Sequence, residues 1–424
     1  EYVKRDLGFH DSTFEVIDEG KSMRERPLVL DSTAQNLGLY PTRGISPLID
    51  AILPSDAPAA CKSFALSLLL NPPPRDTSIA VNKALNFLRN SRVSIPCQYL
   101  IPAGKIQSLF SAEEASDTFF REIHLMLTAV RDLLMSDSLD SVTAGILRVV
   151  QDDAGRKDIS RQLLISTCDD VLREISTTIH NPTTQTPTQD SIEDMDSEIV
   201  PFDHDYKVKG NRNMMSMQAF DYFVRSNEAK FEKRIELSIV SEGMQGYHLA
   251  KQNLREVLEN TMHDVERKIR ERNPEDPSLN TRRVTPLKAT PRLVFDRFNN
   301  AVWIAGQHSI LSESKSGFKR PFDRNMRTVR ERWTTTAIEE ALNAYRDAVV
   351  SMENLVKVYL KSLARKLTPV SPMLGVCATF AKVATLLDLH ARESVRKGWS
   401  MPDIHEILTD SDKISGETSE IPID

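Results

Sequence analysis

The sequence contains little glycine and few aromatic residues. Of its 424 residues, 15 are glycine, and aromatic side chains make up 6% of the chain. Sandwiches and barrels need many tight turns and short strands, so this scarcity, beside many Leu, Ile, Val, Glu and Arg residues, favours helices. A chain of this length exceeds a single hydrophobic core, and we expect two or three domains.

Cysteine and long apolar runs are scarce as well. The four cysteines stand far apart without a C-x-x-C pair, which is typical of a reduced intracellular protein that has no structural zinc site. No apolar run approaches the roughly 18 residues of a membrane helix. The mean hydropathy of -0.34 is that of a soluble globular protein. We therefore expect no membrane partner.

Motifs of nucleotide binding and catalysis are absent from the sequence. No G-x-x-x-x-G-K-[ST] or G-x-G-x-x-G string occurs, and Gly44-Ile45-Ser46-Pro47-Leu48 lacks the second glycine of a nucleophile elbow. A zinc motif beginning at His405-Glu406 would need a second histidine where Thr409 stands. We assign no catalytic residue, metal or cofactor to this chain. Because it begins with Glu1 and not with Met, we expect a fragment or a processed chain.

Apolar residues recur at steps of three and four along much of the chain, which predicts helices with one buried face. The clearest faces are Phe120, Ile123, Leu127, Val130 and Leu134; Leu164, Cys168, Val171, Ile175 and Ile179; Leu254, Leu258, Val265 and Ile269; and Cys377, Phe380, Ala384, Leu387 and Ala391. The third of these helices is expected to be interrupted near Gly243 and Gly246 and to stop at Asn273-Pro274.

The most regular segment follows a strict spacing of four and three residues. Its apolar positions are Ile338, Leu342, Tyr345, Val349, Met352, Val356, Tyr359 and Leu363. We expect a capping box of Thr336 and Glu339 at its start, an unbroken helix to Lys366 of about 45 Å, and an end at Pro369 and Pro372. Such a helix needs a long partner: either the segment ending near Arg272 in the same chain, which we favour, or a second copy in a dimeric coiled coil.

Residues 281–332 are strongly basic. They hold twelve Lys and Arg against four acidic residues, a net charge of +8, while the whole chain carries -6, so that the remainder carries about -14. Within them, Leu293–Phe298 and Ala301–Ala305 flank Asn299-Asn300 and predict a β-hairpin. The basic surface either binds a polyanion or is simply solvated. For Trp303 and Phe298 we favour the small core of this hairpin over base stacking.

These changes of pattern divide the chain into seven parts. We expect an irregular lead-in at 1–45, a helical core at 46–213 with an acidic Thr/Pro-rich loop at 181–201, ascending helices at 214–280, the basic segment at 281–332, a descending helix at 333–368, closing core helices at 369–407 and a polar tail at 408–424. The predicted fold class is mainly α, with a helical core domain and two long helices that carry a small β-containing unit.

This arrangement resembles the core, lever and clamp of MutS mismatch-recognition proteins. Leu30-Asp31 to Asn36-Leu37 is similar to the opening of the family's core domain, and Leu68-Leu69-Leu70-Asn71-Pro72-Pro73 is similar to a turn between two core helices. Arg332-Trp333-Thr334-Thr335 stands where the family has Arg-Phe-Thr-Thr at the return from clamp to lever. The run from Phe380 to Ala391, followed by Trp399-Ser400-Met401-Pro402, resembles the segment that closes the core before the ATPase domain.

Several further strings resemble the organellar MutS homologues of plants and algae. They are Lys105-Ile106 to Phe110, Phe120-Arg121-Glu122-Ile123, the surroundings of Val302-Trp303, and Arg396-Lys397-Gly398-Trp399. The family's Thr-x-x-Gly-x-Arg stretch is replaced by Ser55-Asp56-Ala57-Pro58, which indicates a divergent member. Neither the Phe-x-Glu domain nor the ATPase domain lies in these residues, so the resemblance implies a middle fragment of a larger protein.

The resemblance implies that residues 281–332 form a clamp on the backbone of double-stranded DNA and that the lever helices couple it to an ATPase domain elsewhere. It also implies ATP and Mg²⁺ for the full-length parent, a homo- or heterodimer, and a mitochondrial or plastid location, with the nucleus as the alternative. The residues assigned to DNA binding are Arg282, Arg283, Lys288, Arg292, Arg297, Lys315, Lys319, Arg320, Arg324 and Arg327. The rival hypothesis is an α-helical coiled-coil scaffold that binds protein partners.

Overall fold

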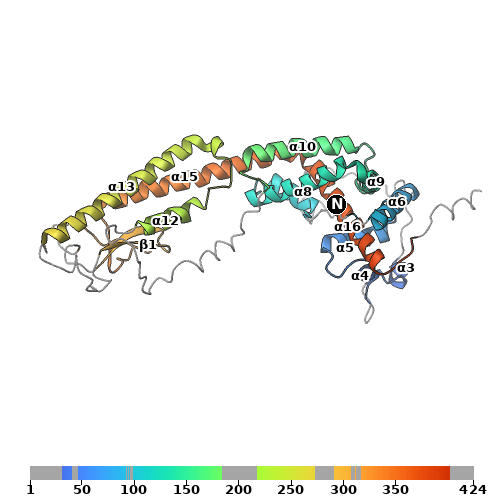
Figure 1. The fold of residues 1–424 in the computed structure, drawn as a ribbon, viewed down its shortest axis with the longest axis horizontal. Coiled ribbons are helices and arrows are strands. Elements are labelled where there is room, and N and C mark those ends of the chain that lie inside the picture. The colour runs from blue at the N-terminus through green and yellow to red at the C-terminus, as the bar shows by residue number, and fades with distance from the viewer. Residues whose placement is uncertain are drawn as a thin grey trace, which may run out of the picture. The chain divides into compact units, whose positions relative to one another are not determined.

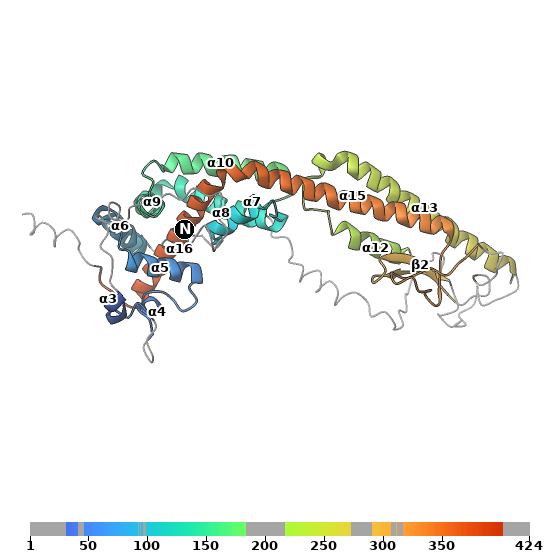
Figure 2. The same ribbon diagram turned by 180° about the vertical axis from the view of Figure 1, so that it is seen from behind.

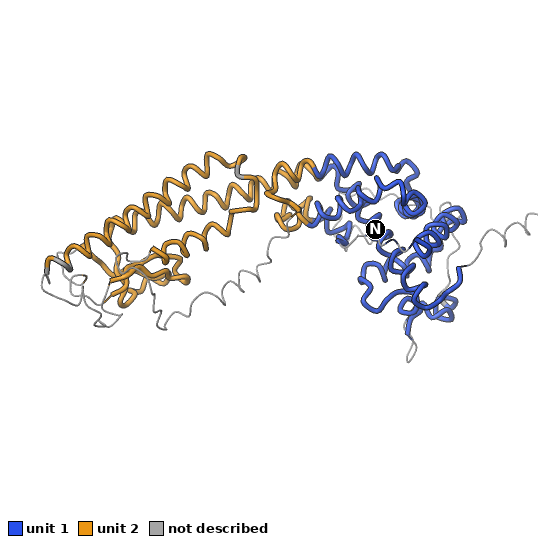
Figure 3. The backbone as a smooth tube through the Cα atoms, viewed as in Figure 1, with its two compact units in different colours: residues 1–108, 122–172, 368–424 blue, residues 109–121, 173–367 orange. Residues whose placement is uncertain are grey.

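Helices dominate the computed structural model of this chain, and the predicted mainly α fold class is confirmed (Figure 1). The structure describes residues 31–40, 46–91, 93, 95, 99–183, 217–272, 291–306, 311 and 317–401. Most of the expected lead-in, nearly all of the acidic loop, and the polar tail lie outside these residues. The chain forms two compact units: unit 1 from residues 1–108, 122–172 and 368–424, and unit 2 from residues 109–121 and 173–367 (Figure 3).

Unit 1 is built around helix α16, Ser371–Arg396. This helix packs against α4 (Leu48–Ile52), α5 (Ala59–Leu70), α6 (Arg75–Ser91) and α9 (Asp140–Ala154). The described part of the unit also contains α3 (Asp31–Asn36), most of α7 (Ala103–Ser111) and α8 (Asp117–Met135), the 3-10 helices η2 (Asp137–Leu139) and η5 (Thr368–Val370), and the first part of α10 (Arg161–Thr178).

The periodic apolar faces predicted on α8, α10 and α16 are buried, as expected. In unit 1, Cys168 on α10 and Cys377 on α16 are fully buried, with their sulfur atoms 4.0 Å apart and both thiols free. The contact with the Cys168 thiol, together with burial, raises the pKa of Cys377, so the Cys377 thiol stays protonated. The two cysteines therefore behave as small apolar side chains in the core.

One helical stretch among the described residues is long and apolar enough to cross a membrane, judged by length and composition alone. An 18-residue window within Thr336–Arg396 has a mean hydropathy of 1.6, although no continuous apolar run occurs there. The search of the sequence for continuous apolar runs did not detect this window. Within the protein 67% of the window is buried, because its apolar side chains already pack against other helices.

Unit 2 is dominated by two antiparallel helices of 32 residues each, α13 (Ser241–Arg272) and α15 (Thr336–Leu367), which lie side by side (Figures 1 and 2). Both the unbroken helix to Lys366 and its pairing with the segment ending near Arg272 are confirmed. The helix α15 ends just before Pro369, as predicted. The other described elements are α12 (Gln218–Glu228), η3 (Leu237–Val240), β1 (Arg292–Asp296), β2 (Ala301–Ala305) and β3 (Arg332–Trp333).

The apolar seam between α13 and α15 includes a buried hydroxyl network. The Tyr247 hydroxyl donates a 2.9 Å hydrogen bond to Glu228 and lies 3.3 Å from the Tyr345 hydroxyl, and Lys251 forms a 2.8 Å ion pair with the same carboxylate. Burial is the main cause that raises the pKa of both tyrosines, so their hydroxyls stay protonated and can donate. The network fixes the two helices and α12 in one register.

Two local expectations for these helices are wrong. The break before α13 lies between α12 and η3, and Gly243 and Gly246 are inside α13. The first residue of α15 is Thr336, whereas Thr335 is the capping residue, whose hydroxyl accepts the backbone N–H of Ile338 at 3.2 Å. Because a capping box joins the cap to the third helical residue, the third position here is Ile338 and Glu339 is outside the box.

Gly243 allows α13 to approach α15 closely. A Cβ atom at this position would lie 2.6 Å from Leu355 Cδ1 and 2.9 Å from Met352 Sδ, whereas a Cβ atom at Gly246 would meet nothing within 4 Å. Glycine inside a helix destabilises it by up to about 1 kcal/mol relative to alanine. Close packing therefore explains why position 243 is a glycine. No contact explains the glycine at position 246.

We predict opposite outcomes for the two glycines. Gly246→Ala raises the free energy of unfolding by about 0.5–1 kcal/mol, because it improves helix propensity without a new contact. Gly243→Ala gives no such gain, because the methyl group overpacks the seam. The free energy of unfolding of this variant should be about 1–3 kcal/mol lower than that of Gly246→Ala. Urea unfolding followed by circular dichroism measures both. Equal stabilisation by the two substitutions would contradict the close approach at Gly243.

Candidate nucleic-acid interface

The predicted hairpin forms the first two strands of a small antiparallel sheet in the order β1-β2-β3. Leu293 pairs with Ile304 and Asp296 with Ala301, while Trp333 on β3 pairs with Ile304. Strand β1 ends at Asp296, so the connection is a four-residue loop at 297–300 instead of the expected Asn-Asn turn. The reason is local: the Asp296 carboxylate accepts the backbone N–H of Asn299 at 3.0 Å and its side-chain amide at 3.1 Å.

The sheet packs on α12 through apolar side chains. The Phe223 ring lies 5.7 Å from the Phe295 ring on β1 and 5.1 Å from the Tyr345 ring on α15, measured between centroids. All of β2 is buried, and Trp303 is 4% exposed, which confirms its place in the core of this unit. One apolar layer thus joins the sheet, α12 and α15.

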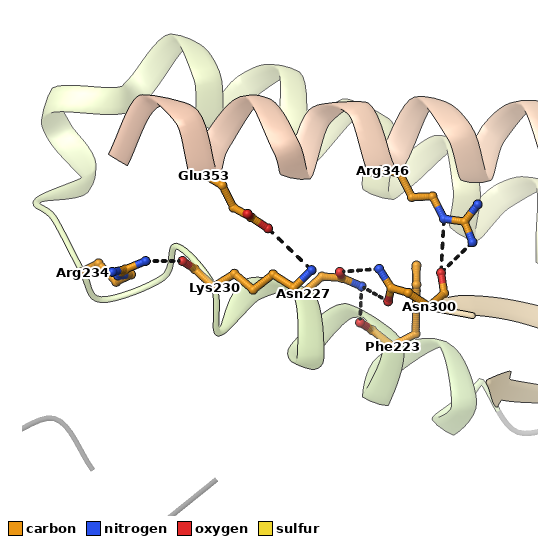
Figure 4. Close-up of polar contacts among 7 residues, drawn as sticks. All are labelled: Phe223, Asn227, Lys230, Arg234, Asn300, Arg346 and Glu353. Carbon is orange, nitrogen blue, oxygen red and sulfur yellow. Dashed lines mark hydrogen bonds and ion pairs between the residues drawn. The ribbon is translucent and has the colours of Figure 1, made fainter. Parts of the chain in front are cut away.

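A buried polar contact fixes the hairpin loop between α12 and α15 (Figure 4). The side-chain amides of Asn227 and Asn300 donate to each other's oxygen atoms at 3.1 and 3.0 Å, and Asn227 also donates to the Phe223 carbonyl at 2.9 Å. The Arg346 guanidinium of α15 donates to the carbonyls of Asn299 and Asn300 at 3.0 and 2.8 Å. Burial lowers the pKa of Arg346, and the nearby charge of Arg324 adds to this effect.

Asn300 adopts a positive φ of 47°, which asparagine tolerates better than most residues. Its amide pair with Asn227, which is 1% exposed, keeps the loop in this conformation. Lys230, in the turn just after α12, forms a 3.5 Å ion pair with Glu353 of α15 (Figure 4). The hairpin loop, which carries Arg297, is therefore held by the helices.

We predict that Asn227→Leu lowers the free energy of unfolding by about 1–3 kcal/mol, because the amide of Asn300 is left without its buried partner. Hydrogen exchange at residues 297–300 should become faster in the variant. Tyr222→Leu on the exposed face of the same helix is the control and should leave stability within about 0.5 kcal/mol. Unchanged exchange in the loop would show that the amide pair does not hold it.

Six of the ten predicted DNA-binding residues lie in the part of the chain that the structure describes, and all six are exposed. Arg292 begins β1, Arg297 lies in the hairpin loop, and Lys319, Arg320, Arg324 and Arg327 lie in the segment before β3. The other four, Arg282, Arg283, Lys288 and Lys315, lie outside the described residues.

The described cations differ in their surroundings. Lys319 forms an ion pair with Glu339 at the start of α15, so its charge is largely neutralised. The guanidinium of Arg320 lies over the Trp333 ring at 5.3 Å from its centroid, and that of Arg324 lies over the Phe298 ring at 5.8 Å. Within the described ranges, Arg320, Arg324 and Arg327 form no ion pair, so their charges face solvent.

The segment before β3 is shaped by Asp323. Its carboxylate accepts the backbone N–H groups of Asn325 and Arg327 at 2.8 and 2.7 Å. Because these bonds go to the backbone, the carboxylate fixes the turn without forming an ion pair with Arg327. Met326 at the turn has a positive φ of 61° and is 77% exposed.

The prediction that Phe298 lies in the hairpin core is wrong. Its side chain is 68% exposed, because β1 ends at Asp296 and Phe298 lies in the loop. Phe322 is 56% exposed in the neighbouring segment. Sequence reasoning also omitted the exposed Arg330 from the site, although it belongs to the same basic segment. The spacing of Asp296 and Asn299, which is typical of a side-chain turn, was the signal that could have placed Phe298 outside the strand.

No group of three or more His, Cys, Asp and Glu side chains in the described part of the chain is placed to hold a metal ion. The fold and this surface define a mainly helical protein in which a long antiparallel helix pair carries a small sheet with exposed arginines and aromatic rings. The chemistry of these features is suited to an anionic partner.

Comparison with known proteins gives one informative similarity. No family model matches the chain. Over 129 residues the chain is 30% identical to the protein named DNA mismatch repair protein MSH1, mitochondrial, of Arabidopsis thaliana. The match covers 30% of this chain and 11% of that protein, so the chain spans a small part of its length. The similarity supports a MutS-like relationship at the level of the family.

Proposed function

We propose that this chain is the core, lever and clamp portion of a MutS-like DNA repair protein. In this proposal the surface around the β1–β2 loop and the segment before β3 is the clamp, and it holds the backbone of duplex DNA without reading its sequence. The observation that carries the proposal is that Arg320, Arg324 and Arg327 are exposed and form no ion pair with the residues that the structure describes, in the segment before β3 of a sheet carried by two 32-residue helices. The 30% identity to a mismatch repair protein supports the same conclusion.

The distribution of charge along the chain favours binding of DNA at the clamp. Residues 281–332 carry a net charge of +8, while the rest of the chain carries about -14. Phosphates are attracted to the clamp and repelled by the remainder, so the basic surface determines where DNA binds. Contacts from Arg and Lys to phosphates supply affinity and position but no sequence information.

The base of unit 2 is tied together by charged groups, as a lever requires. The Arg121 guanidinium donates to the carbonyls of Asn181 and Lys233 at 2.7 and 2.6 Å. Arg234 forms a 2.7 Å ion pair with Asp117, and Arg365 near the end of α15 forms a 2.9 Å ion pair with Glu113. A helix pair fixed in this way can transmit a displacement between its ends, as coupling to another domain needs.

The remaining parts of the proposal concern the whole protein. They are coupling of DNA binding to an ATPase domain that lies outside these 424 residues and uses ATP and Mg²⁺, formation of a homo- or heterodimer, and an organellar location. The resemblance to MutS proteins suggests the coupling and the dimer, and the similarity to a mitochondrial mismatch repair protein supports the organellar location.

The scaffold hypothesis requires that the apolar seam of α15 be available to a partner. In unit 2 this seam is occupied by α13: Tyr345 and Met352 are at most 1% exposed, and Gly243 lies against Met352. A dimer formed through this seam would have to displace α13. The intrachain pairing therefore favours the clamp over the scaffold.

The clamp proposal predicts that affinity for duplex DNA falls steeply with salt. Arg327→Gln should lower the slope of log K against log salt concentration by about 0.9, the value of one phosphate contact. Lys319→Gln is the matched control and should lower the slope less, because Glu339 already neutralises Lys319. Fluorescence anisotropy at several salt concentrations measures both slopes.

A slope that neither substitution changes would remove the clamp assignment. Sedimentation of the same samples tests the rival: a dimer that is indifferent to DNA would favour the scaffold. Circular dichroism of each variant confirms that the fold is intact, since both side chains are exposed.

A further inference from the structure

We propose that the clamp surface binds unpaired bases of single-stranded DNA by stacking, in addition to its contacts with phosphates. The residues that carry this inference form the stacking strip, which we define as Phe298, Arg320, Phe322, Arg324 and Trp333. The inference rests on the proposed function in one respect, namely that DNA is the partner. It adds the class of DNA and the chemistry of the contact.

The first observation is the exposure of two phenylalanine rings beside arginines. Phe298 and Phe322 are 68% and 56% exposed, although burying such a side chain in the core would stabilise the fold by roughly 1.5–3 kcal/mol. Phosphate binding does not need these rings, because phosphates contact cations and N–H groups. Their exposure among positive charges therefore indicates a partner that offers both phosphates and apolar faces.

The second observation is that each exposed arginine of the strip lies over an aromatic ring. Arg324 is 5.8 Å from the centroid of Phe298, and Arg320 is 5.3 Å from the centroid of Trp333. The Trp333 ring is fixed by its indole N–H, which donates to the Gly306 carbonyl at 3.0 Å. Bases stack on aromatic rings and on guanidinium planes alike, so two such pairs offer two stacking positions.

The third observation is that the chain presents these side chains together. Arg320, Phe322 and Arg324 are exposed and alternate with the buried Pro321 and the half-buried Asp323. Because successive side chains of an extended segment point to opposite sides, Arg320 and Phe322 share one side, and Arg324 begins the turn that follows. An isolated bridge pairs Phe322 with Thr328 and fixes this extended conformation.

The strip is also rigid before any ligand binds. The backbone N–H of Arg324 donates to the side-chain oxygen of Asn299 at 3.1 Å, which joins the segment to the hairpin loop. That loop is itself fixed by Arg346 and by the amide pair of Asn227 and Asn300. A surface that is already ordered loses little conformational entropy on binding, which raises affinity.

Unpaired DNA fits this surface better than duplex DNA. In a duplex the faces of the bases are covered by their neighbours, and the backbone presents phosphates and sugars but no base face. In a single strand the faces are available, and the arginines can still contact the phosphates between them. A protein partner with an apolar groove would also cover the rings, but it would not account for the net charge of +8 of this segment.

The test compares two single strands that carry the same number of phosphates. One is a fluorescent oligothymidine of about 12 nucleotides, and the other is an oligonucleotide of the same length with abasic sites in place of every base. We expect the 424-residue chain to bind the strand with bases more tightly by roughly 5- to 100-fold. Phe298→Leu and Phe322→Leu should each lower affinity for that strand and leave affinity for the abasic strand unchanged.

Two controls separate stacking from general effects of exposed apolar residues. Phe298→Trp keeps an aromatic face and should retain the preference for bases. Val358→Ala removes apolar surface from a side chain that is 61% exposed on α15 and should change nothing. Thermal unfolding of each variant shows whether the fold is preserved.

Equal affinity of the unsubstituted chain for the two strands would overturn the inference, as would loss of both affinities together in the leucine variants. If duplex binding keeps its salt dependence in that case, the clamp proposal stands without the stacking strip. If neither single strand nor duplex binds, the clamp proposal fails and the inference fails with it. Leucine variants that change only self-association in sedimentation would assign the rings to a protein contact and would also overturn the inference.

Discussion

The close packing of α13 on α15 is the constraint on which unit 2 depends. Helices of this length owe most of their stability to tertiary contacts, and here each supplies the core of the other. Gly243 sets the distance between them, and the buried hydroxyls of Tyr247 and Tyr345 set their register. Because Tyr345 also contacts Phe223, the same seam supports α12 and, through it, the sheet. The position of the sheet follows from the helix pair and not from a large core of its own.

A polar contact completes this support where an apolar one could not. Apolar packing tolerates small shifts, whereas the amides of Asn227 and Asn300 are paired in a single geometry, and leaving either unpaired in the interior is unfavourable. Arg346 adds two carbonyl bonds at the same point, so that its buried charge is compensated by backbone dipoles. The result is a short loop whose conformation is determined by helices distant in the sequence, and this brings Phe298 and Arg324 to the surface together.

Much of this fold could be predicted from the sequence, because a periodic apolar face reports burial directly. The spacing from Ile338 to Leu363 predicts the long helix, and the two apolar runs within the basic segment predict the hairpin. Three features could not be predicted this way. Periodicity does not reveal how closely another helix approaches, so Gly243 was mistaken for a break. The hydroxyl that caps α15 belongs to Thr335, one residue before the predicted cap. The carboxylate of Asp296 ends β1 before Phe298, so that Phe298 does not join the core. Each error arose from a single hydrogen bond or contact that competes with a regional pattern.

The candidate site shows the same limit for charge. Counting residues gives every cation of the segment 281–332 equal weight, but a cation that already has a partner attracts DNA less. Lys319 is paired with Glu339, whereas Arg320 and Arg324 lie over rings that leave their charge intact. The carboxylate of Asp323 bonds to the backbone and so does not cancel Arg327. In the described part of this segment, two arginines that form no ion pair, Arg320 and Arg324, therefore lie next to aromatic rings. A surface with charge alone would hold any polyanion equally, and the rings are what would allow this one to distinguish among nucleic acids by the state of their bases.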